Sequence, residues 1–269
     1  MESVKLNNGV KMPLVGLGTW DLNGSECTDT VAAALRMGYR LVDTAQMYEN
    51  ERAVGKGIAA SGVPREELFV TTKLYRRSNS YEKAKRAIDE SLRALNLDYV
   101  DLLLLHEPYR QGPEMYKALE EACRAGNARA IGISNYDEHW YAEFLKQCEI
   151  VPAVNQLEVH VFFQRHGFQR EMTRHGTAVQ ASAPLAQGIG NVAGQPLLSQ
   201  IVAKYSKTAA QVALRFLVQR GIPVIPKSRR IEQLRENLAL FDFELSQADM
   251  ARIQTLDQNT TLFPWTTEF

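Results

Sequence analysis

Short apolar segments alternate along the chain with longer segments in which apolar residues recur every three or four positions. The short segments are rich in Val, Ile and Leu and have polar residues at both ends, which is typical of strands buried in a parallel sheet. The longer segments predict amphipathic helices, most clearly at 81–95 and 208–221. Eight short segments are expected to be strands, at residues 14–18, 40–45, 69–74, 100–105, 130–134, 153–158, 178–182 and 223–227.

Eight strands that alternate with helices favour a (β/α)8 TIM barrel. An open, doubly wound sheet is the alternative, but the strand count and the chain length favour the barrel, as a single domain over residues 1–269. Ahead of the first strand, SVKLNNGVKM has Asn8 and Gly9 at its centre, which indicates a β-hairpin with a type I′ turn. We expect this hairpin to plug the bottom of the barrel. The segment 186–222 is longer than one connection between neighbouring strands needs, and we expect it to hold a long loop and a helix.

Charge and composition argue against several classes of protein. The 31 basic residues balance the 31 acidic ones, so the chain has no overall charge with which to attract nucleic acid or an anionic membrane. It contains no run of about 18 apolar residues, as a membrane span requires, and its first residues lack the apolar core of a signal peptide. Its three cysteines are far apart, which argues against a disulfide framework or a metal site. We therefore expect a cytoplasmic protein without a metal, and take a monomer as the default.

Polar side chains stand where three neighbouring strands of the predicted barrel end. Asp43, Lys73 and His106 follow one another at intervals of 30 and 33 residues, each about the length of one βα unit. Tyr48 lies in the loop directly after Asp43. Because the carboxyl ends of barrel strands meet at one rim, we expect these four side chains to converge. Each of them singly also has an ordinary explanation. Asp43 would cap a turn and Lys73 would reach from the rim to water. His106 would be an ordinary buried histidine, and Tyr48 a packed, half-buried tyrosine.

Together, the four side chains suit the transfer of a proton to a developing alkoxide. The unperturbed pKa of a tyrosine is about 10, and a neighbouring lysine ammonium lowers it by stabilising the phenolate. A carboxylate at Asp43 would keep a buried Lys73 charged. His106 would orient a carbonyl oxygen or pass a proton. This set predicts the reduction of a carbonyl group, with the hydride supplied by another molecule.

Seven motifs stand in the order found in the aldo-keto reductase family: GLGTW (16–20), DTAQMYENE (43–51), TTKL (71–74), LLLLHEP (102–108), IGISN (131–135), NQLE (155–158) and IPKS (225–228). The chain most resembles the branch of bacterial 2,5-diketogluconate reductase and prostaglandin F synthase-like proteins. The resemblance implies a barrel that reduces aldehydes and ketones with NADPH. It also implies a catalytic tetrad with Tyr48 as the general acid, made of Asp43, Tyr48, Lys73 and His106.

The same resemblance implies a cofactor site. The nicotinamide carboxamide would be held by Ser134, Asn135 and Gln156, and the adenosine 2′-phosphate by Lys227 and Ser228. Glu236 and Asn237 match contacts of the adenine. The full set of implied contacts is Gly18, Thr19, Trp20, Asp43, Ser134, Asn135, Gln156, Ser182, Pro184, Leu185, Ile225, Lys227, Ser228, Arg229, Gln233, Glu236 and Asn237.

Two local patterns bear on this site independently of the resemblance. IPKSRRIEQLREN places the end of a strand directly before the start of a helix, where free N–H groups and the positive end of the helix favour an anion. Arg229 and Arg230 add positive charge there. The segment GLGTWD has Asp21 where a dinucleotide fingerprint needs its third glycine, so the Rossmann alternative is disfavoured.

The chain departs from the family pattern at several positions. Glu107 stands where the family usually has a Trp. Its carboxylate would favour a protonated His106, make the pocket more polar and repel acidic substrates. Ser182 replaces the aromatic residue that stacks on the nicotinamide, so we expect a weaker affinity for the cofactor. Gln233 replaces an arginine, so we expect the preference for NADPH to leave room for NADH. The tail TLFPWTTEF also differs from the usual one. The expected substrate contacts are Trp20, Tyr48, His106 and Glu107; Met47 is a candidate pocket wall, and Tyr75, Trp140 and Trp265 are weaker candidates.

Two other functions remain open from the residues alone. A lysine at the end of a barrel strand can form an imine with a carbonyl substrate, as in a Schiff-base lyase, but Asp43 opposes the neutral Lys73 that this needs. A nucleotide-sensing binding module with weak or no turnover is the other alternative. The departures at Glu107 and Ser182 favour such a module, and the intact tetrad argues against it.

Overall fold

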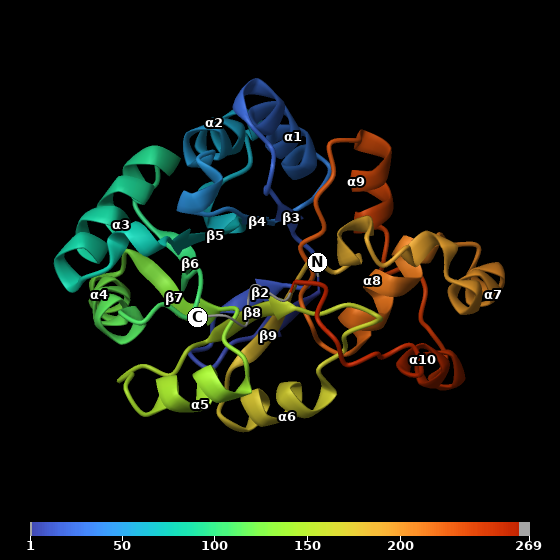
Figure 1. The fold of residues 1–269 in the computed structure, drawn as a ribbon. Coiled ribbons are helices and arrows are strands. Elements are labelled where there is room, and N and C mark those ends of the chain that lie inside the picture. The colour runs from blue at the N-terminus through green and yellow to red at the C-terminus, as the bar shows by residue number, and fades with distance from the viewer. Residues whose placement is uncertain (1, 264–269) are drawn as a thin grey trace.

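The computed structural model describes residues 2–263. Its centre is a sheet of seven parallel strands that pair in chain order, surrounded by helices (Figure 1). Apolar side chains on both faces bury most residues of these strands, as the continuous apolar segments predict. The strands are β3 (Leu17–Gly18), β4 (Leu41–Asp43), β5 (Phe69–Leu74), β6 (Val100–Leu105), β7 (Ala128–Ser134), β8 (Val154–Glu158) and β9 (Ala178–Ser182).

The segment around Val224 closes this sheet into a barrel. Val224 forms parallel bridges both to Val15, next to β3, and to Ala181 in β9. It thus takes the eighth strand position, and the predicted (β/α)8 architecture is confirmed. Only isolated bridges form over the predicted strand 223–227, because Pro223 and Pro226 have no N–H group to donate to a regular ladder.

The predicted helix at 81–95 is confirmed as α3 (Tyr81–Leu95), with Ser80 as its N-cap. The prediction at 208–221 corresponds to α8 (Ala209–Gln219), which begins with a capping box at Thr208. The other helices are α1 (Gly24–Arg36), α2 (Glu51–Ser61), α4 (Gly112–Ala125), α5 (Glu138–Leu145), α6 (His166–Arg174), α7 (Pro196–Tyr205), α9 (Ile231–Leu238) and α10 (Gln247–Gln254). Short 3-10 helices occur at Gln46–Tyr48, Arg65–Glu67, Arg76–Ser78, Ala186–Gly188 and Val192–Gly194.

The segment 186–222 holds more structure than its sequence predicts. Two 3-10 helices and α7 precede α8, where a long loop was expected. The helix α7 begins at Pro196, which suits the first turn of a helix, and buries only Leu198 and Ile201 completely. Two buried residues in ten make a short apolar stripe, so the periodic signal of α7 is weak.

The N-terminal hairpin pairs β1 (Ser3–Lys5) with β2 (Lys11–Pro13) and lies across the middle of the ring of strands (Figure 1). Its side chains pack against the lower barrel interior, in one cluster with residues such as Leu41 and Leu102. The predicted type I′ turn is wrong. The Gly9 N–H donates to the Leu6 carbonyl, and in this loop only Gly9 has a positive φ, of 88°. Asn8 therefore keeps an ordinary backbone conformation. Gly9 takes the position after the turn that needs a positive φ, which glycine adopts without strain.

Residues 2–263 show neither a membrane-spanning helix nor a metal-binding cluster of side chains. No helix in this range is long and apolar enough to cross a membrane. No group of three or more His, Cys, Asp or Glu side chains within it is arranged to hold a metal ion. The three cysteines are free thiols, of which Cys27 is buried.

Candidate active site

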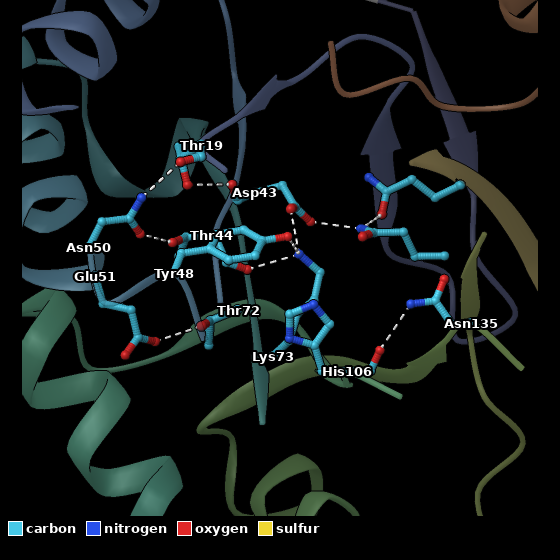
Figure 2. Close-up of polar contacts among 12 residues, drawn as sticks. Thr19, Asp43, Thr44, Tyr48, Asn50, Glu51, Thr72, Lys73, His106 and Asn135 are labelled. Carbon is cyan, nitrogen blue, oxygen red and sulfur yellow. Dashed lines mark hydrogen bonds and ion pairs between the residues drawn. The ribbon is translucent and has the colours of Figure 1, made fainter. Parts of the chain in front are cut away.

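The ends of three neighbouring strands bring the predicted tetrad together (Figure 2). Asp43 is the last residue of β4, Lys73 lies near the end of β5, and His106 directly follows β6. Their side chains are almost completely buried. Tyr48 ends the 3-10 helix Gln46–Tyr48 and turns its hydroxyl towards Lys73. The register of the parallel strands therefore produces the convergence that the spacing predicts.

A buried ion pair lies at the centre of this group. The Lys73 Nζ lies 2.5 Å from the Asp43 Oδ1. It also donates to the Thr44 carbonyl at 3.0 Å and to the Tyr48 Oη at 3.2 Å. Burial lowers the pKa of Lys73, but the charge of Asp43 and the hydrogen bonds to Asp43 and Tyr48 outweigh burial and raise it overall. Lys73 is consequently a stable cation despite its burial.

The Tyr48 hydroxyl is protonated in this environment. Burial raises its pKa above the ordinary value, and Asp43 and Glu107 act in the same direction. Lys73 lowers it, as the sequence analysis expects, but does not outweigh burial. Tyr48 therefore holds its proton at neutral pH, and the nearby ammonium stabilises the phenolate that remains after that proton leaves.

His106 is a neutral imidazole. Burial, and secondly the charge of Lys73, lowers its pKa well below the usual value. The expectation that Glu107 would favour a protonated His106 is therefore wrong, because burial dominates. Burial also raises the pKa of Glu107 itself, to about 7, although a hydrogen bond from Asn135 and the charge of Lys73 oppose this rise. The His106 ring contacts the Tyr48 ring edge-on, with 5.6 Å between the centroids.

Two amide side chains fix the loop that carries Tyr48. Asn50 donates to the carbonyls of Thr19 and Leu22 at 2.8 Å and accepts from the Thr44 hydroxyl at 2.7 Å (Figure 2). Gln46 donates to the Ala87 carbonyl of α3 at 2.9 Å. Neither role was predicted from the sequence. The sequence feature that could have indicated these roles is the position of both residues inside the DTAQMYENE motif, on either side of Tyr48.

Gln156, in the middle of β8, extends the polar network across the barrel. Its Nε2 donates to the Asp43 Oδ2 at 2.7 Å and to the Gln180 Oε1 at 2.7 Å. A carboxylate only accepts hydrogen bonds, so the amide must turn its NH2 group towards Asp43. Its carbonyl oxygen then remains for a ligand. Gln180, a fully buried residue of β9, was not predicted from the sequence.

A cavity of about 850 Å³ opens at this end of the barrel. It runs from the tetrad to the segment after Val224, and Glu107, Met47 and Phe263 also line it. Another cavity, of about 750 Å³, lies beside α2 and α3, but no tetrad residue lines it. The first cavity contains 14 of the 17 predicted cofactor contacts, namely Gly18, Thr19, Trp20, Asp43, Asn135, Gln156, Ser182, Pro184, Leu185, Ile225, Lys227, Gln233, Glu236 and Asn237.

Three predicted cofactor contacts lie beside this cavity without lining it. Ser134 is buried at the end of β7. Ser228 is also buried and donates to the Gln233 Oε1 at 2.7 Å. Arg229 forms ion pairs with Asp21 at 3.0 Å and with Glu26 at 3.2 Å. An incoming anion must therefore compete for Arg229 with these carboxylates.

Several cavity residues escaped the sequence analysis, above all in the segment 183–193. Four non-glycine residues between positions 183 and 191 have positive φ angles, and this backbone gives no periodic signal. Among the weaker candidates, Tyr75 lines the other cavity and Trp140 packs against the core. Trp265 lies outside the described residues.

Comparisons with known proteins agree with this geometry. The family model of the Aldo/keto reductase family matches residues 14–258. The chain is 43% identical to glyoxal reductase of Bacillus subtilis (strain 168), over 98% of the chain and 95% of that protein. It is 40% identical to morphine 6-dehydrogenase of Pseudomonas putida, over 97% and 93%. The crystal structure of an aldo-keto reductase from a Medee basin deep-sea metagenome library has a TM-score of 0.94 and 39% identity, and covers 97% of both chains. The chain therefore belongs to the aldo/keto reductase family, a family of oxidoreductases that act on carbonyl groups.

Proposed function

We propose that the protein reduces aldehydes and ketones with NADPH and that Tyr48 is the general acid. One observation carries this proposal: the Lys73 Nζ lies 3.2 Å from the Tyr48 Oη and 2.5 Å from the Asp43 Oδ1. A phenol is a weak acid, and a fixed ammonium beside it is the feature that proton donation requires. The orientation of Tyr48 towards the cavity supports the same role.

Each residue of the tetrad has a separate role in the proposed reaction. When bound, NADPH supplies the hydride. The Tyr48 hydroxyl donates its proton to the carbonyl oxygen as negative charge develops there, and Lys73 stabilises the resulting phenolate. Neutral His106 orients the substrate oxygen next to Tyr48. Asp43 holds Lys73 in its charged form and accepts a hydrogen bond from Gln156, whose amide would hold the nicotinamide carboxamide.

The cavity fits a dinucleotide. It joins the free carbonyl oxygen of Gln156 to the basic residue Lys227, and its volume is in the range of ligand pockets. Lys227 and the nearby Arg229 favour the additional phosphate of NADPH over NADH. Because Gln233 engages Ser228 and brings no positive charge, we expect the preference to be partial, with measurable use of NADH.

The alternatives receive less support. A Schiff base needs an uncharged lysine, and the pair with Asp43 favours the charged form of Lys73. The comparisons give no support to a nucleotide-sensing module without turnover. Borohydride trapping of a carbonyl compound on Lys73 would revive the first alternative, and tight NADPH binding without turnover on any carbonyl would revive the second.

The test is NADPH oxidation, followed by the absorbance of the reduced nicotinamide. Glyoxal is the first substrate, because the similar protein of Bacillus subtilis is a glyoxal reductase, and a reactive aromatic aldehyde is the second. Each is measured with NADPH and with NADH. We expect turnover with both substrates and a lower KM for NADPH than for NADH. Absence of turnover with both cofactors would overturn the proposal.

A further inference from the structure

Asp21 pairs with both cations of the proposed 2′-phosphate site. Its Oδ2 atom lies 3.0 Å from the Arg229 Nη2 and 3.5 Å from the Lys227 Nζ. Arg229 also donates to the Asp21 backbone carbonyl at 2.6 Å and forms an ion pair of 3.2 Å with Glu26, in the first turn of α1. Both cations are therefore already engaged by carboxylates.

The end of the cavity next to Lys227 is not rich in positive charge. Among the described residues that line it there, Lys227 is accompanied by the carboxylates of Asp21 and Glu236. Arg229 lies beside the cavity and does not line it. A phosphate that binds here must therefore draw Lys227 and Arg229 away from Asp21 before it gains their charge.

The backbone holds Asp21 at this wall. Its φ of 60° lies in the left-handed region, which few non-glycine residues adopt and which Asp and Asn tolerate best. Asn50 donates to the carbonyls of Thr19 and Leu22, on either side of Asp21, at 2.8 Å. Together with the bond from Arg229 to the Asp21 carbonyl, these contacts fix the turn. The turn therefore presents the carboxylate to both cations from a fixed place.

We propose that Asp21 limits the selectivity of this protein for NADPH over NADH, because its carboxylate competes with the 2′-phosphate for Lys227 and Arg229. The proposal rests on the proposed function, which places that phosphate at these two cations. A ligand with a 2′-phosphate must displace the carboxylate from both of them, whereas a ligand with a 2′-hydroxyl leaves their pairs intact. Asp21 thus weakens the binding of NADPH and has little influence on that of NADH.

The magnitude follows from the charges that an incoming phosphate meets. Single ion pairs at a surface are weak, but here one carboxylate is shared by two cations and also repels the phosphate. Two unit charges about 4 Å apart in water change an equilibrium about fivefold, and a phosphate monoester carries about 1.5 to 2 charges at neutral pH. We therefore expect removal of the Asp21 charge to strengthen the binding of a 2′-phosphate roughly tenfold. Since the side chains of Asp21 and Arg229 are about half exposed, salt should reduce this gain.

The test is isothermal titration calorimetry of the full chain with adenosine 2′,5′-bisphosphate and with adenosine 5′-monophosphate, which differ only in the 2′-phosphate. Wild type is compared with Asp21→Asn and with Asp29→Asn. Asparagine keeps the size of the side chain, tolerates the left-handed backbone and retains the carbonyl that accepts from Arg229. Asp29 is an exposed residue of α1 outside the cavity lining, so its variant controls for the loss of one negative charge.

We expect Asp21→Asn to bind the bisphosphate roughly tenfold more tightly than wild type at low salt, and to lose most of this gain at about 0.5 M NaCl. The monophosphate should bind to both proteins alike, and Asp29→Asn should behave as wild type. Unchanged binding of the bisphosphate to Asp21→Asn would overturn the proposal. Weaker binding would also overturn it and would show that Asp21 holds the two cations in place for the phosphate. An equal gain for both nucleotides, or the same gain in Asp29→Asn, would assign the effect to overall charge and contradict competition at the 2′-phosphate.

These measurements are separable from the proposed function. The two nucleotides carry no nicotinamide, so their binding does not depend on carbonyl reduction. If no carbonyl compound is turned over and the nucleotides bind as expected, the proposed function fails and the role of Asp21 stands. If the protein is active, the ratio of the KM for NADH to that for NADPH should rise roughly tenfold in Asp21→Asn, and an unchanged ratio would overturn the role of Asp21 alone. If every variant binds the bisphosphate no better than the monophosphate, the 2′-phosphate lies elsewhere and the proposal is wrong.

Discussion

Glu107→Gln is expected to stabilise the protein at alkaline pH. Burial raises the pKa of Glu107 from its ordinary value of 4.5 to about 7. At about 1.4 kcal/mol per pH unit, this difference corresponds to about 3 kcal/mol. Because the pKa is raised in the folded state, the stability contributed by the protonated carboxyl group is complete below pH 4.5. It is lost as the pH rises towards about 7 and stays lost above that value. Glutamine has nearly the same shape and does not ionise, so it avoids this loss.

The assay is urea unfolding of the ligand-free protein at pH 5 and pH 8, with the exposed Glu66→Gln as a control for loss of a surface charge. The free energy of unfolding of Glu107→Gln relative to wild type should be more favourable at pH 8 than at pH 5 by about 2–3 kcal/mol. The control should show a pH dependence close to that of wild type. If the difference between Glu107→Gln and wild type is the same at both pH values, Glu107 is solvated or paired, and the reasoning is refuted.

Three further substitutions test other parts of the site. Asp43→Asn leaves the buried charge of Lys73 without its partner and should lower the free energy of unfolding by about 3–5 kcal/mol in urea titrations; an unchanged midpoint would contradict the buried ion pair. Arg229→Ala should raise the KM for NADPH several-fold and leave that for NADH unchanged, whereas equal effects on both would exclude a contact with the 2′-phosphate. Gln180→Leu removes the acceptor that helps to orient Gln156 and should weaken NADPH binding by roughly tenfold in fluorescence titrations; unchanged binding would show that Asp43 orients Gln156 alone.

Much of the fold could be predicted because its signals are local. A buried parallel strand needs a short apolar segment, and β5 and β6 coincide with the predicted segments 69–74 and 100–105. The tetrad could be placed because regular βα units bring the ends of neighbouring strands to one rim. Asp43 and Lys73 needed only this spacing and the chemical complementarity of their charges.

The remaining features depend on what lies around a residue in space. The backbone of residues 183–193 has no regular period, so the sequence does not predict that this segment lines the cavity. The ionisation of His106 and Tyr48 is dominated by burial, which outweighs the charges of neighbours that the sequence suggests. Gln180 lies on a strand with an ordinary pattern, and only the folded barrel brings it to Gln156.

The central claim is that Tyr48 donates the proton. The most direct measurement is kcat of Tyr48→Phe with NADPH and glyoxal, together with the affinity for NADPH, because phenylalanine keeps the ring and removes only the hydroxyl. We expect kcat to fall by roughly a hundredfold or more, as for the loss of a general acid, while the affinity for NADPH changes little. A kcat close to that of wild type would contradict the claim and would leave His106 as the remaining donor in the tetrad.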